Sequence, residues 1–288
     1  MVNAGSRRGT KLFGQAVDEF DRRGVVLRER HAVREPRSLV SLAQRLVDSG
    51  VRTIVVGGGD GTLAGIASVF VDSDATLGIL PLGTGNSFAQ TLGIPLDLHG
   101  AVDTIVRGHA ESVDLGVVNG RFFVNAASIG LSVVVARRTA GALKRILGPA
   151  AYLVTGAIEA WRHRSFQATL ELDGVERTLR TQQIIITNGR FFGTTPLGGA
   201  DQVVSERLLV LGLEGTTPWE LARFWAAMLA GHPEWLREVY TRSVRELRIA
   251  TRPHRSIELD GEVRVRTPAT FSVLPKALRV FVPAKDGA

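Results

Sequence analysis

The chain of 288 residues contains no cysteine, which excludes disulfide bonds, thiolate nucleophiles, iron–sulfur clusters and cysteine-ligated zinc. It also lacks a long apolar run, because the longest, Ile146–Trp161, is interrupted by Gly148-Pro149 and is too short to cross a membrane. Met1–Thr10 has no apolar segment of the kind that a signal peptide carries. These absences predict a cytoplasmic protein, and 44% hydrophobic residues suffice for one large or two modest cores.

Lysine is scarce as well, although basic residues outnumber acidic ones by 35 to 28 and give a net charge of +7. Lysine occurs only at positions 11, 144, 276 and 285, so the positive charge is almost entirely arginine. Because a guanidinium group binds phosphate through two parallel hydrogen bonds, nucleotides, lipid head groups and nucleic acid are all reasonable partners. A genomic preference for arginine codons would produce the same composition, so charge alone does not decide between them.

Up to about Asp114 the chain alternates helical periodicity with short apolar segments. Leu39, Leu42 and Leu46 lie on one helical stripe, whereas Thr53–Val56 is typical of a buried strand. This alternation predicts a doubly wound α/β domain with a mostly parallel sheet. The expected helices are Lys11–Arg23, Ser38–Ser49, a helix after Gly61, Ser87–Leu92 and Ala101–Arg107, and the expected strands are Val25–Val33, Thr53–Val56, Leu77–Leu80 and Glu111–Val118.

Beyond Asp114 the pattern changes to strands of alternating polarity, which is typical of an antiparallel domain. Two helical segments interrupt it, around Gly141–Arg164 and at Trp219–Leu229. The last strand, Leu278–Val282, could join either part of the chain. The other expected strands are Phe122–Ala126, Phe166–Leu172, Glu176–Thr187, Leu208–Glu214, Val244–Ala250 and Ser256–Leu259.

A glycine-rich loop, Gly57-Gly58-Gly59-Asp60-Gly61-Thr62, connects a predicted strand to a predicted helix. Glycines let backbone N–H groups approach a phosphate, and a helix N-terminus adds positive potential, so the position suits a phosphate. A P-loop is excluded because no Gly-Lys-Ser/Thr follows, and a dinucleotide fingerprint lacks its acidic residue about 20 positions on. A turn that merely packs stays open. Asp60 would repel a bare phosphate but suits one chelated to Mg²⁺.

A second glycine-rich turn, Pro81-Leu82-Gly83-Thr84-Gly85-Asn86, follows the next predicted strand. Two such turns on neighbouring parallel strands would form one crevice, where ligands of open α/β sheets bind. Thr84 offers a hydroxyl and Asn86 an amide. Alternatively, the turn is only tight, with Asn86 capping the next helix. Far downstream, Asp260-Gly261-Glu262 by itself indicates a hairpin turn.

Taken together, these three motifs resemble those of the diacylglycerol kinase catalytic-domain family, the soluble lipid kinases that include sphingosine and ceramide kinases. The first motif is shared with NAD kinases of the same superfamily, whereas the other segments favour the lipid kinases. The resemblance covers essentially the whole chain. Further matching segments are Val113-Asp114-Leu115-Gly116, Phe123-Val124-Asn125 through Gly130, Asn188-Gly189-Arg190-Phe191-Phe192-Gly193 and Pro275-Lys276-Ala277-Leu278-Arg279-Val280 to Pro283.

The resemblance implies an N-terminal doubly wound α/β domain, residues 1–114, and a C-terminal antiparallel β-sandwich, residues 115–270, with residues 271–288 returning to the first domain. It implies transfer of the γ-phosphate of ATP, with Mg²⁺, to the hydroxyl of a diacylglycerol-like lipid. The protein would meet this lipid peripherally at a membrane surface, without a nucleic-acid partner. A homodimer stays open as the oligomeric state.

The same resemblance implies roles for individual residues. Asp60 would be catalytic and would organise Mg²⁺, and Glu262 would be the general base that takes the proton of the lipid hydroxyl. Asp114 would join the acidic network near the metal, and Glu206 would lie in a structural metal loop. The residues implied in nucleotide binding are Asn3, Gly58, Gly59, Asp60, Gly61, Thr62, Gly83, Thr84, Gly85, Asn86 and Asp114.

Several positions depart from the family pattern. Ser87 follows Asn86 where the family usually has aspartate, and Ala64-Gly65 stands where it usually has Asn-Glu. Arg207 lies in the metal loop, where its charge opposes a cation, and Met1-Val2 directly precedes Asn3, so the first strand is short. Two other functions therefore stay open: a catalytically weak nucleotide- or lipid-binding regulator, and a kinase of a soluble acceptor such as NAD⁺.

Two features concern surfaces. The pairs Arg137-Arg138 and Lys144-Arg145 flank the longest apolar stretch, a layout that suits either an anionic membrane surface or a helix packed between domains. A second group of residues falls in a region that we predict to be helical, and we expect it in the core or at an interface. It consists of Trp219, Trp225, Trp235 and Tyr240.

Overall fold

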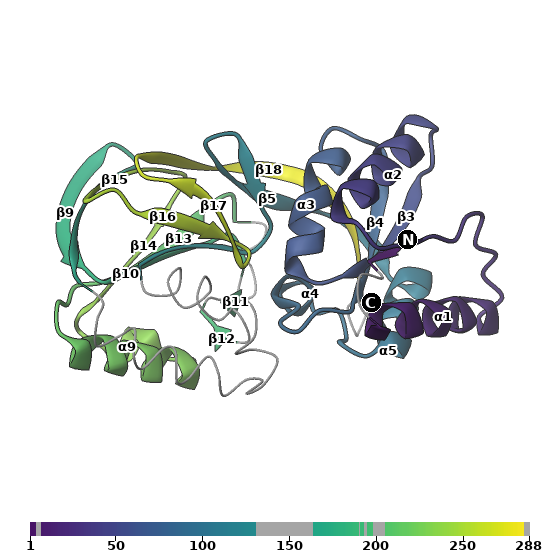
Figure 1. The fold of residues 1–288 in the computed structure, drawn as a ribbon, viewed down its shortest axis with the longest axis horizontal. Coiled ribbons are helices and arrows are strands. Elements are labelled where there is room, and N and C mark those ends of the chain that lie inside the picture. Colours follow the sequence, from purple (N-terminus) through teal and green to yellow (C-terminus); the bar gives the residue numbers. More distant parts are fainter. Residues whose placement is uncertain (4–6, 131–163, 190, 193–194, 198–204, 285–288) are drawn as a thin grey trace. The chain divides into compact units, whose positions relative to one another are not determined.

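The computed structural model describes residues 1–3, 7–130, 164–189, 191–192, 195–197 and 205–284, which form two compact units (Figure 1). The first unit is built mainly from Met1–Leu115, the second from Gly116–Gln202 and Glu206–Val273, and the chain returns to the first unit at Leu274. The helical segment expected around Gly141–Arg164 and its basic pairs fall, up to residue 163, outside the described residues.

The first unit is an α/β unit with a parallel sheet, as the sequence predicts. The strand order is β2 (Ala32–Val33), β1 (Val2–Asn3), β3 (Thr53–Gly58), β4 (Thr76–Pro81) and β18 (Ala269–Val282), and each neighbouring pair is parallel. Helices α2 (Pro36–Asp48) and α3 (Asp60–Phe70) pack together on one side of the sheet, and α1 (Arg7–Arg22) and α5 (Leu98–Arg107) on the other (Figure 1). The short helix α4 (Ser87–Thr91) follows β4.

Burial on both faces explains why the central strands are continuous apolar runs. Val56, Leu77 and Ile79 are at most 1% exposed because helices cover the sheet on both sides. The stripe of α2 that faces α3 and the sheet includes Leu39 and Leu46, both buried. The two glycine-rich loops follow these strands, so a fully buried sheet fixes the positions from which both loops start.

The strand expected at Val25–Val33 is wrong over most of its length, because only Ala32–Val33 pairs, with β1. Val26 is 90% exposed, and the charged residues after it have no neighbouring strand. β1 supplies two residues, Val2 and Asn3, so the partner strand at this edge can be only equally short.

The second unit is an antiparallel β-sandwich, again as predicted. One sheet has the order β18, β15 (Glu246–Arg252), β8 (Phe166–Leu172) and β9 (Val175–Thr181), with β5 (His109–Val118) beside β18 and β6 (Arg121–Phe123) beside β5. The other has the order β14 (Val239–Val244), β13 (Leu208–Leu213), β10 (Gln183–Thr187), β7 (Ala126–Gly130), β16 (Ser256–Leu259) and β17 (Glu262–Arg266). A separate pair is formed by β11 (Phe191–Phe192) and β12 (Thr195–Pro196).

The core of the second unit lies between its two sheets and includes Phe123, Phe166 and Phe271, which are each at most 1% exposed. The ring centroids of Phe123 and Phe271 are 6.2 Å apart in an edge-to-face arrangement. The outer face of the second sheet packs against helix α9 (Pro218–Ala230), which agrees with the helix expected at Trp219–Leu229 and is followed by the short helix η2 (Pro233–Trp235). Within the described residues, none of the helices combines the length and apolar character that a bilayer span needs.

Three of the strand predictions merge or displace elements that the structure separates. Phe122–Ala126 is in fact the end of β6 and the start of β7, interrupted at Val124-Asn125. Glu176–Thr187 is β9 and β10, which belong to different sheets and are separated at Gln182. The Val244–Ala250 prediction spans the end of β14 and most of β15. No glycine or proline marks any of these breaks, so the usual turn signals do not reveal them.

The strand expected at Leu278–Val282 is the end of the 14-residue strand β18. Its first part pairs with β15 in the second unit, at Ala269–Ser272, and its last part pairs with β4, at Val280. The alternative of joining one part of the chain or the other is thus resolved: this strand contributes to both units.

Gly116 tests how tightly the second unit is packed. A Cβ atom at this position would lie 2.2 Å from the ring of Phe123, whereas nothing lies within 4 Å of the corresponding position at Gly65. We expect Gly116→Ala to lower the free energy of unfolding by about 1–3 kcal/mol, because the ring must move within a close-packed core. Gly65→Ala, in helix α3, should leave stability unchanged or raise it by up to about 1 kcal/mol. Calorimetric unfolding of both variants checks this, and equal effects would contradict it.

Candidate functional site

The two glycine-rich loops lie side by side at the carboxyl ends of β3 and β4. These strands are paired in register up to Gly58 and Pro81, so both loops leave the sheet at the same edge. A Cβ atom on Gly83 would lie 2.5 Å from the Cα atom of Gly59, and one on Gly59 would lie 3.0 Å from the Cα atom of Gly83. The loops can therefore approach this closely only because both positions are glycine.

Asp60 connects the two loops. Its Oδ2 accepts a hydrogen bond of 3.0 Å from the backbone N–H of Ser87, and its Oδ1 accepts one of 2.9 Å from the backbone N–H of Phe88. The carboxylate thus satisfies two amides at the start of α4, which have no partner within that helix. Asp60 is itself the first residue of α3, so one side chain fixes the starts of two helices relative to each other.

Asn86 shapes its own loop. Its Oδ1 accepts from the backbone N–H of Gly83 at 2.8 Å, and its Nδ2 donates to the carbonyl oxygens of Gly83 at 3.0 Å and Pro81 at 3.3 Å. The backbone of Asn86 is left-handed, with φ of 51°, and its side chain makes no capping hydrogen bond to α4. Asn86 therefore occupies the N-cap position of α4, as that alternative expects, but its side chain does not cap the helix, because Asp60 accepts from those amides. Thr84, in contrast, is exposed, as is Gly61 in the first loop.

Asn3 supports the first loop from β1. Its Nδ2 donates to the Oγ1 atom of Thr62 at 3.1 Å, and a Cβ atom on Gly58 would lie 2.6 Å from the side chain of Thr62. Asn3, Gly58 and Thr62 are thus brought together, as expected for a loop that rests on the start of the chain. Residues 4–6 lie outside the described residues.

Asp114 is 1% exposed, and its Oδ1 accepts a hydrogen bond of 2.9 Å from the backbone N–H of Lys276. Lys276 has φ of 50°, so this bond stabilises a left-handed residue within strand β18. The structure thus gives Asp114 an anchoring contact on the shared strand. Its expected place in an acidic network stays a prediction.

In the second unit, Asp260 holds the β16–β17 hairpin against the start of β7. Its Oδ2 accepts from the backbone N–H of Val124 at 2.8 Å, and its Oδ1 accepts from those of Asn125 and Ala126 at 3.0 Å each. Asp260 and Gly261 have φ of 46° and 91°, and they form the two-residue turn that Asp-Gly indicates. Glu262 follows directly, exposed, as the first residue of β17.

Glu258 is a buried carboxyl group that sequence reasoning missed. It faces Ser128 across the β16–β7 pair, and burial raises its pKa from 4.5 to about 7, with the negative charge of Asp260 adding to the effect and a hydrogen bond with Ser128 opposing it. Its Oε2 has no hydrogen-bond partner among the described residues. Because side chains alternate along β16, Glu258 lies on the other face of the sheet from the apolar Ile257 and Leu259. Nothing in the sequence signals that its carboxyl group is buried.

Glu206, the implied ligand of a structural metal, lies 3.9 Å from the guanidinium of Arg245. The neighbouring Arg207 pairs with Asp173 at 2.9 Å. Cations thus surround this loop, and the described residues contain no group of three or more carboxylate or imidazole side chains that could hold a metal ion. These surroundings do not fit a metal ion at Glu206.

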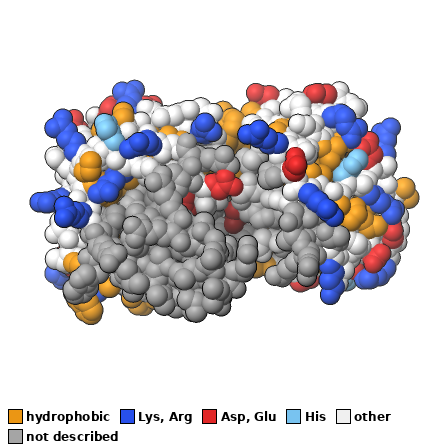
Figure 2. Space-filling model, in the orientation of Figure 1, with side chains coloured by type: hydrophobic (Ala, Val, Ile, Leu, Met, Phe, Trp, Pro, Cys, Tyr) orange, Lys and Arg blue, Asp and Glu red, His pale blue; other side chains and the backbone are white. Residues whose placement is uncertain are grey.

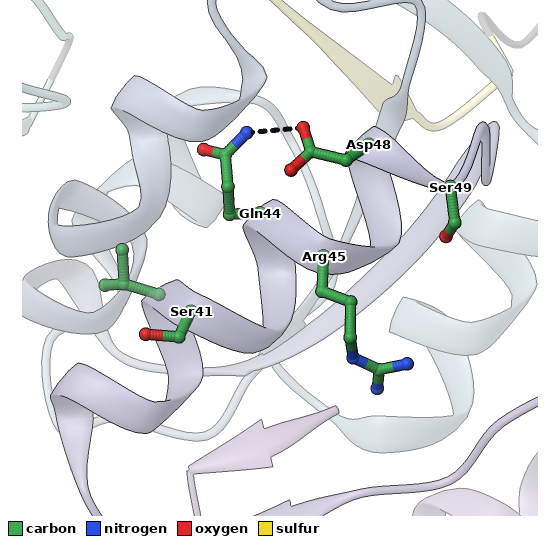
Figure 3. A pocket seen from close by; sticks show the side chains of 6 residues that line it. Ser41, Gln44, Arg45, Asp48 and Ser49 are labelled. Atoms are coloured by element: carbon green, nitrogen blue, oxygen red, sulfur yellow. Dashed lines mark hydrogen bonds between the residues drawn. The ribbon is translucent and has the colours of Figure 1, made fainter.

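A shallow hollow lies elsewhere, on the outer face of α2 (Figure 3). Its polar side chains satisfy one another or nearby groups: Gln44 donates to Asp48 at 2.8 Å, and Arg45 pairs with Glu29 at 3.2 Å. None of the residues expected at the site lines this hollow. The glycine loops of the first unit and the Asp260 hairpin of the second are therefore the better candidates.

Comparison with known proteins divides the chain into the same two kinds of unit. Residues 1–118 match the diacylglycerol kinase catalytic domain, and residues 125–282 match the YegS C-terminal NAD kinase beta sandwich-like domain. A Pseudomonas aeruginosa protein named "Probable lipid kinase YegS-like" is 32% identical over 95% of this chain and 93% of its own length. A Staphylococcus aureus protein named diacylglycerol kinase is 28% identical over 84% of this chain and 78% of its own length.

Other relatives extend these matches. A protein of Synechocystis is 30% identical over 81% of this chain, which spans 55% of that relative's length. A crystal structure from Bacillus anthracis superposes with a TM-score of 0.79 at 22% identity, covering 98% of this chain and 95% of its own, and shows the shared fold. A parallel sheet with two glycine loops, combined with an NAD kinase-like β-sandwich, defines the class of two-unit fold. Within that class, the chain belongs to the diacylglycerol kinase family of lipid kinases.

The hydrogen bonds to Asp260 predict a cost for removing one acceptor oxygen. Asp260→Asn leaves a single oxygen for three backbone N–H groups, so we expect the free energy of unfolding to fall by about 1–3 kcal/mol. Asp72→Asn is the control, because Asp72 is exposed and is also left-handed, with φ of 57°. Hydrogen exchange at residues 124–126 should accelerate only in the first variant, and unchanged exchange there would contradict the assignment.

Glu258 predicts a pH dependence of stability. A carboxyl group with a pKa of 4.5 in the unfolded chain and about 7 in the folded protein binds more protons when folded. Stability therefore falls as the pH rises between these values, by up to about 3 kcal/mol. Glu258→Gln removes this loss, so its melting temperature relative to the wild type should rise from about pH 5 to about pH 8. Glu176→Gln makes the same side-chain change at an exposed position on β9 and serves as the control. A melting-temperature difference between Glu258→Gln and the wild type that stays constant with pH would contradict the raised pKa of Glu258.

Proposed function

We propose that the protein is an ATP-dependent lipid kinase that transfers the γ-phosphoryl group to the hydroxyl of a diacylglycerol-like lipid. The observation that carries this proposal is the pair of glycine loops tied together by Asp60, in a chain that belongs to the diacylglycerol kinase family. The lipid acceptor is a membrane component, so the proposal includes a peripheral enzyme that meets its substrate from the cytoplasm, with no nucleic-acid partner.

The loops would bind the nucleotide mainly through backbone N–H groups. Gly59 and Gly83 have no side chains to obstruct a phosphate, and the exposed Thr84 can donate its hydroxyl. Asn3, Thr62 and Asn86 would hold the loops in shape through the hydrogen bonds described above. Gly58, Gly61 and Gly85 complete the two loops. Because these contacts are preformed within the unit, little ordering would accompany nucleotide binding.

The donor set near the glycine loops fits a magnesium ion carried by the nucleotide. Mg²⁺ is usually held by one or two carboxylates together with substrate phosphates, and each oxygen of Asp60 accepts one backbone N–H and so retains acceptor capacity. When bound, the ion would neutralise charge on the transferred phosphoryl group. Asp60 would hold it, and Asp114 would contribute negative charge nearby.

Glu262 would act as the general base. It is exposed at the start of β17, directly after the turn that Asp260 fixes, so its side chain reaches the surface from a rigid backbone. Accepting the hydroxyl proton would make the lipid oxygen a better nucleophile toward the γ-phosphorus. The roles of Asp60 and Glu262 are thus distinct: one orients charge and the other removes a proton.

The test is incorporation of label from γ-labelled ATP into lipid, with mixed micelles of diacylglycerol and a total lipid extract. We expect wild-type protein to label a lipid product and Glu262→Gln to be about 10²–10⁴-fold slower, because a general base contributes about that much. Glu176→Gln removes another exposed carboxylate on a strand of the same unit and should keep full activity.

Two outcomes would contradict the proposal. ATP binding without labelling of lipid would favour the regulator, for which the hydroxyl of Ser87 in place of a carboxylate is the structural reason. Label that enters NAD⁺ and no lipid would favour a kinase of a soluble acceptor. Full activity of Glu262→Gln would leave a lipid kinase with a different base.

A further inference from the structure

Helix α9 is apolar on two opposite faces. Leu221, Phe224 and Met228 are at most 1% exposed and pack against the outer face of the second sheet. On the opposite side Trp219, Ala222 and Ala226 are exposed, and Trp219 is 72% exposed. A surface helix normally places charged and polar residues on its outer face, so this composition indicates that the outer face meets another apolar phase.

A second exposed tryptophan lies just beyond the helix. Trp235, in η2, is 70% exposed, and its ring stacks on that of His232 with 4.1 Å between the centroids. The two tryptophans therefore mark the two ends of a helix roughly 20 Å long. Figure 2 shows hydrophobic side chains at the lower left edge of the molecule, where Figure 1 places α9. Of the two places expected from the sequence, the core or an interface, exposure excludes the core for these two residues, whereas Trp225 is partly buried against the sheet.

The helix holds Trp219 on a rigid frame. Thr217 caps the N-terminus by accepting from the backbone N–H of Glu220, and Glu220 Oε2 accepts from the backbone N–H groups of Thr216 and Thr217 at 2.9 Å each. At the other end, Gly231 has φ of 81° and forms the C-cap. Both ends are thus fixed, and the outer face is a preformed surface.

Two arginines and the carboxylates of Glu220 and Glu238 lie around this face. Arg223 lies among the exposed alanines and pairs with Glu238 at 3.3 Å. Arg237 is exposed, and within the described parts of the chain no ion pair engages it. The carboxylate of Glu220 is used by the N-cap. An exposed arginine beside two tryptophans is complementary to a surface that is apolar inside and carries phosphate groups outside.

We propose that this surface, which we name the α9 face, docks on an anionic lipid bilayer. It consists of Trp219, Ala222, Arg223, Ala226, Ala230, His232, Trp235 and Arg237. The tryptophan rings insert at the level of the head groups, and Arg237 binds lipid phosphate. The inference rests on the proposed function, since an enzyme whose acceptor is a membrane lipid must contact the bilayer.

A second copy of the chain fits this face less well. One helical face of about 20 by 10 Å is small against the roughly 800 Å² that each partner buries in a stable interface. A two-fold pairing would also bury the arginines of both copies, and the carboxylate of Glu238 already pairs with Arg223. A lipid surface offers phosphate groups to Arg237.

The experiment is sedimentation with vesicles of phosphatidylcholine, alone or mixed with phosphatidylglycerol, in the absence of ATP. We expect wild-type protein to bind the anionic vesicles. The double variant Trp219→Ser/Trp235→Ser should bind at least about tenfold more weakly, because it lacks the two large rings whose apolar surface would pass from water into the bilayer. Arg237→Glu should weaken binding about fivefold or more. Arg28→Glu makes the same charge change at an exposed arginine of the first unit and should bind like the wild type.

A second measurement locates the rings directly. Brominated lipids should quench the fluorescence of the wild type more than that of Trp219→Phe/Trp235→Phe, which keeps the apolar face. Equal quenching, or vesicle binding unaffected by loss of both tryptophans, would overturn the proposal, as would failure of the wild type to bind. A wild-type dimer that the serine variant dissociates would identify the face as a subunit contact instead.

The result of the vesicle-binding test can be distinguished from the result of the kinase test. Phosphorylation of a short-chain diacylglycerol dispersed as monomers requires no bilayer, so the serine variant should retain it within about twofold. Loss of that activity in the wild type would count against the kinase, whereas vesicle binding is scored without any turnover.

Discussion

The arrangement of the first unit depends on one carboxylate. Asp60 accepts hydrogen bonds from the amides of Ser87 and Phe88, and this contact holds the loop after β3 against the loop after β4. Charged acceptors of backbone N–H groups stabilise by about 1.5–3 kcal/mol each, enough to keep two glycine-rich loops from sampling other conformations. Gly59 and Gly83 are flexible by nature, so the rigidity of this edge comes from Asp60 and Asn86 rather than from the glycines themselves.

The second unit uses the same device. Asp260 bonds three consecutive amides, from Val124 to Ala126, and thereby fixes the hairpin that presents Glu262. In both units an aspartate next to glycine looks, in sequence, like a ligand or a turn residue. In the structure each aspartate binds backbone amides from a distant segment. The residues proposed for chemistry are therefore positioned by carboxylates that also have a structural role.

Sequence periodicity predicts the buried parts of this fold well and the exposed parts poorly. The strands β3 and β4 were expected almost to their ends, because burial on both faces demands continuous apolar residues. The strand before Val33 was overestimated, because an edge strand is limited by its neighbour rather than by its own composition. The loop motifs located Asp60 and Asp260, but not their partners, which lie 27 to 136 residues away. The burial of Glu258 and the exposure of Trp219 and Trp235 could not be predicted from the sequence. Both depend on which strands and helices pack around these residues in the folded chain.

The shared strand β18 has a consequence for biosynthesis. It follows every other strand that the structure describes, yet it pairs with β15 in one unit and with β4 in the other, and Asp114 accepts a hydrogen bond from the backbone N–H of its residue Lys276. Neither sheet can therefore be completed while this strand is still inside the ribosome. The α/β unit, although almost all of it is synthesised first, must wait for the rest of the polypeptide, so both units reach their final hydrogen bonding together and only after translation has passed residue 282.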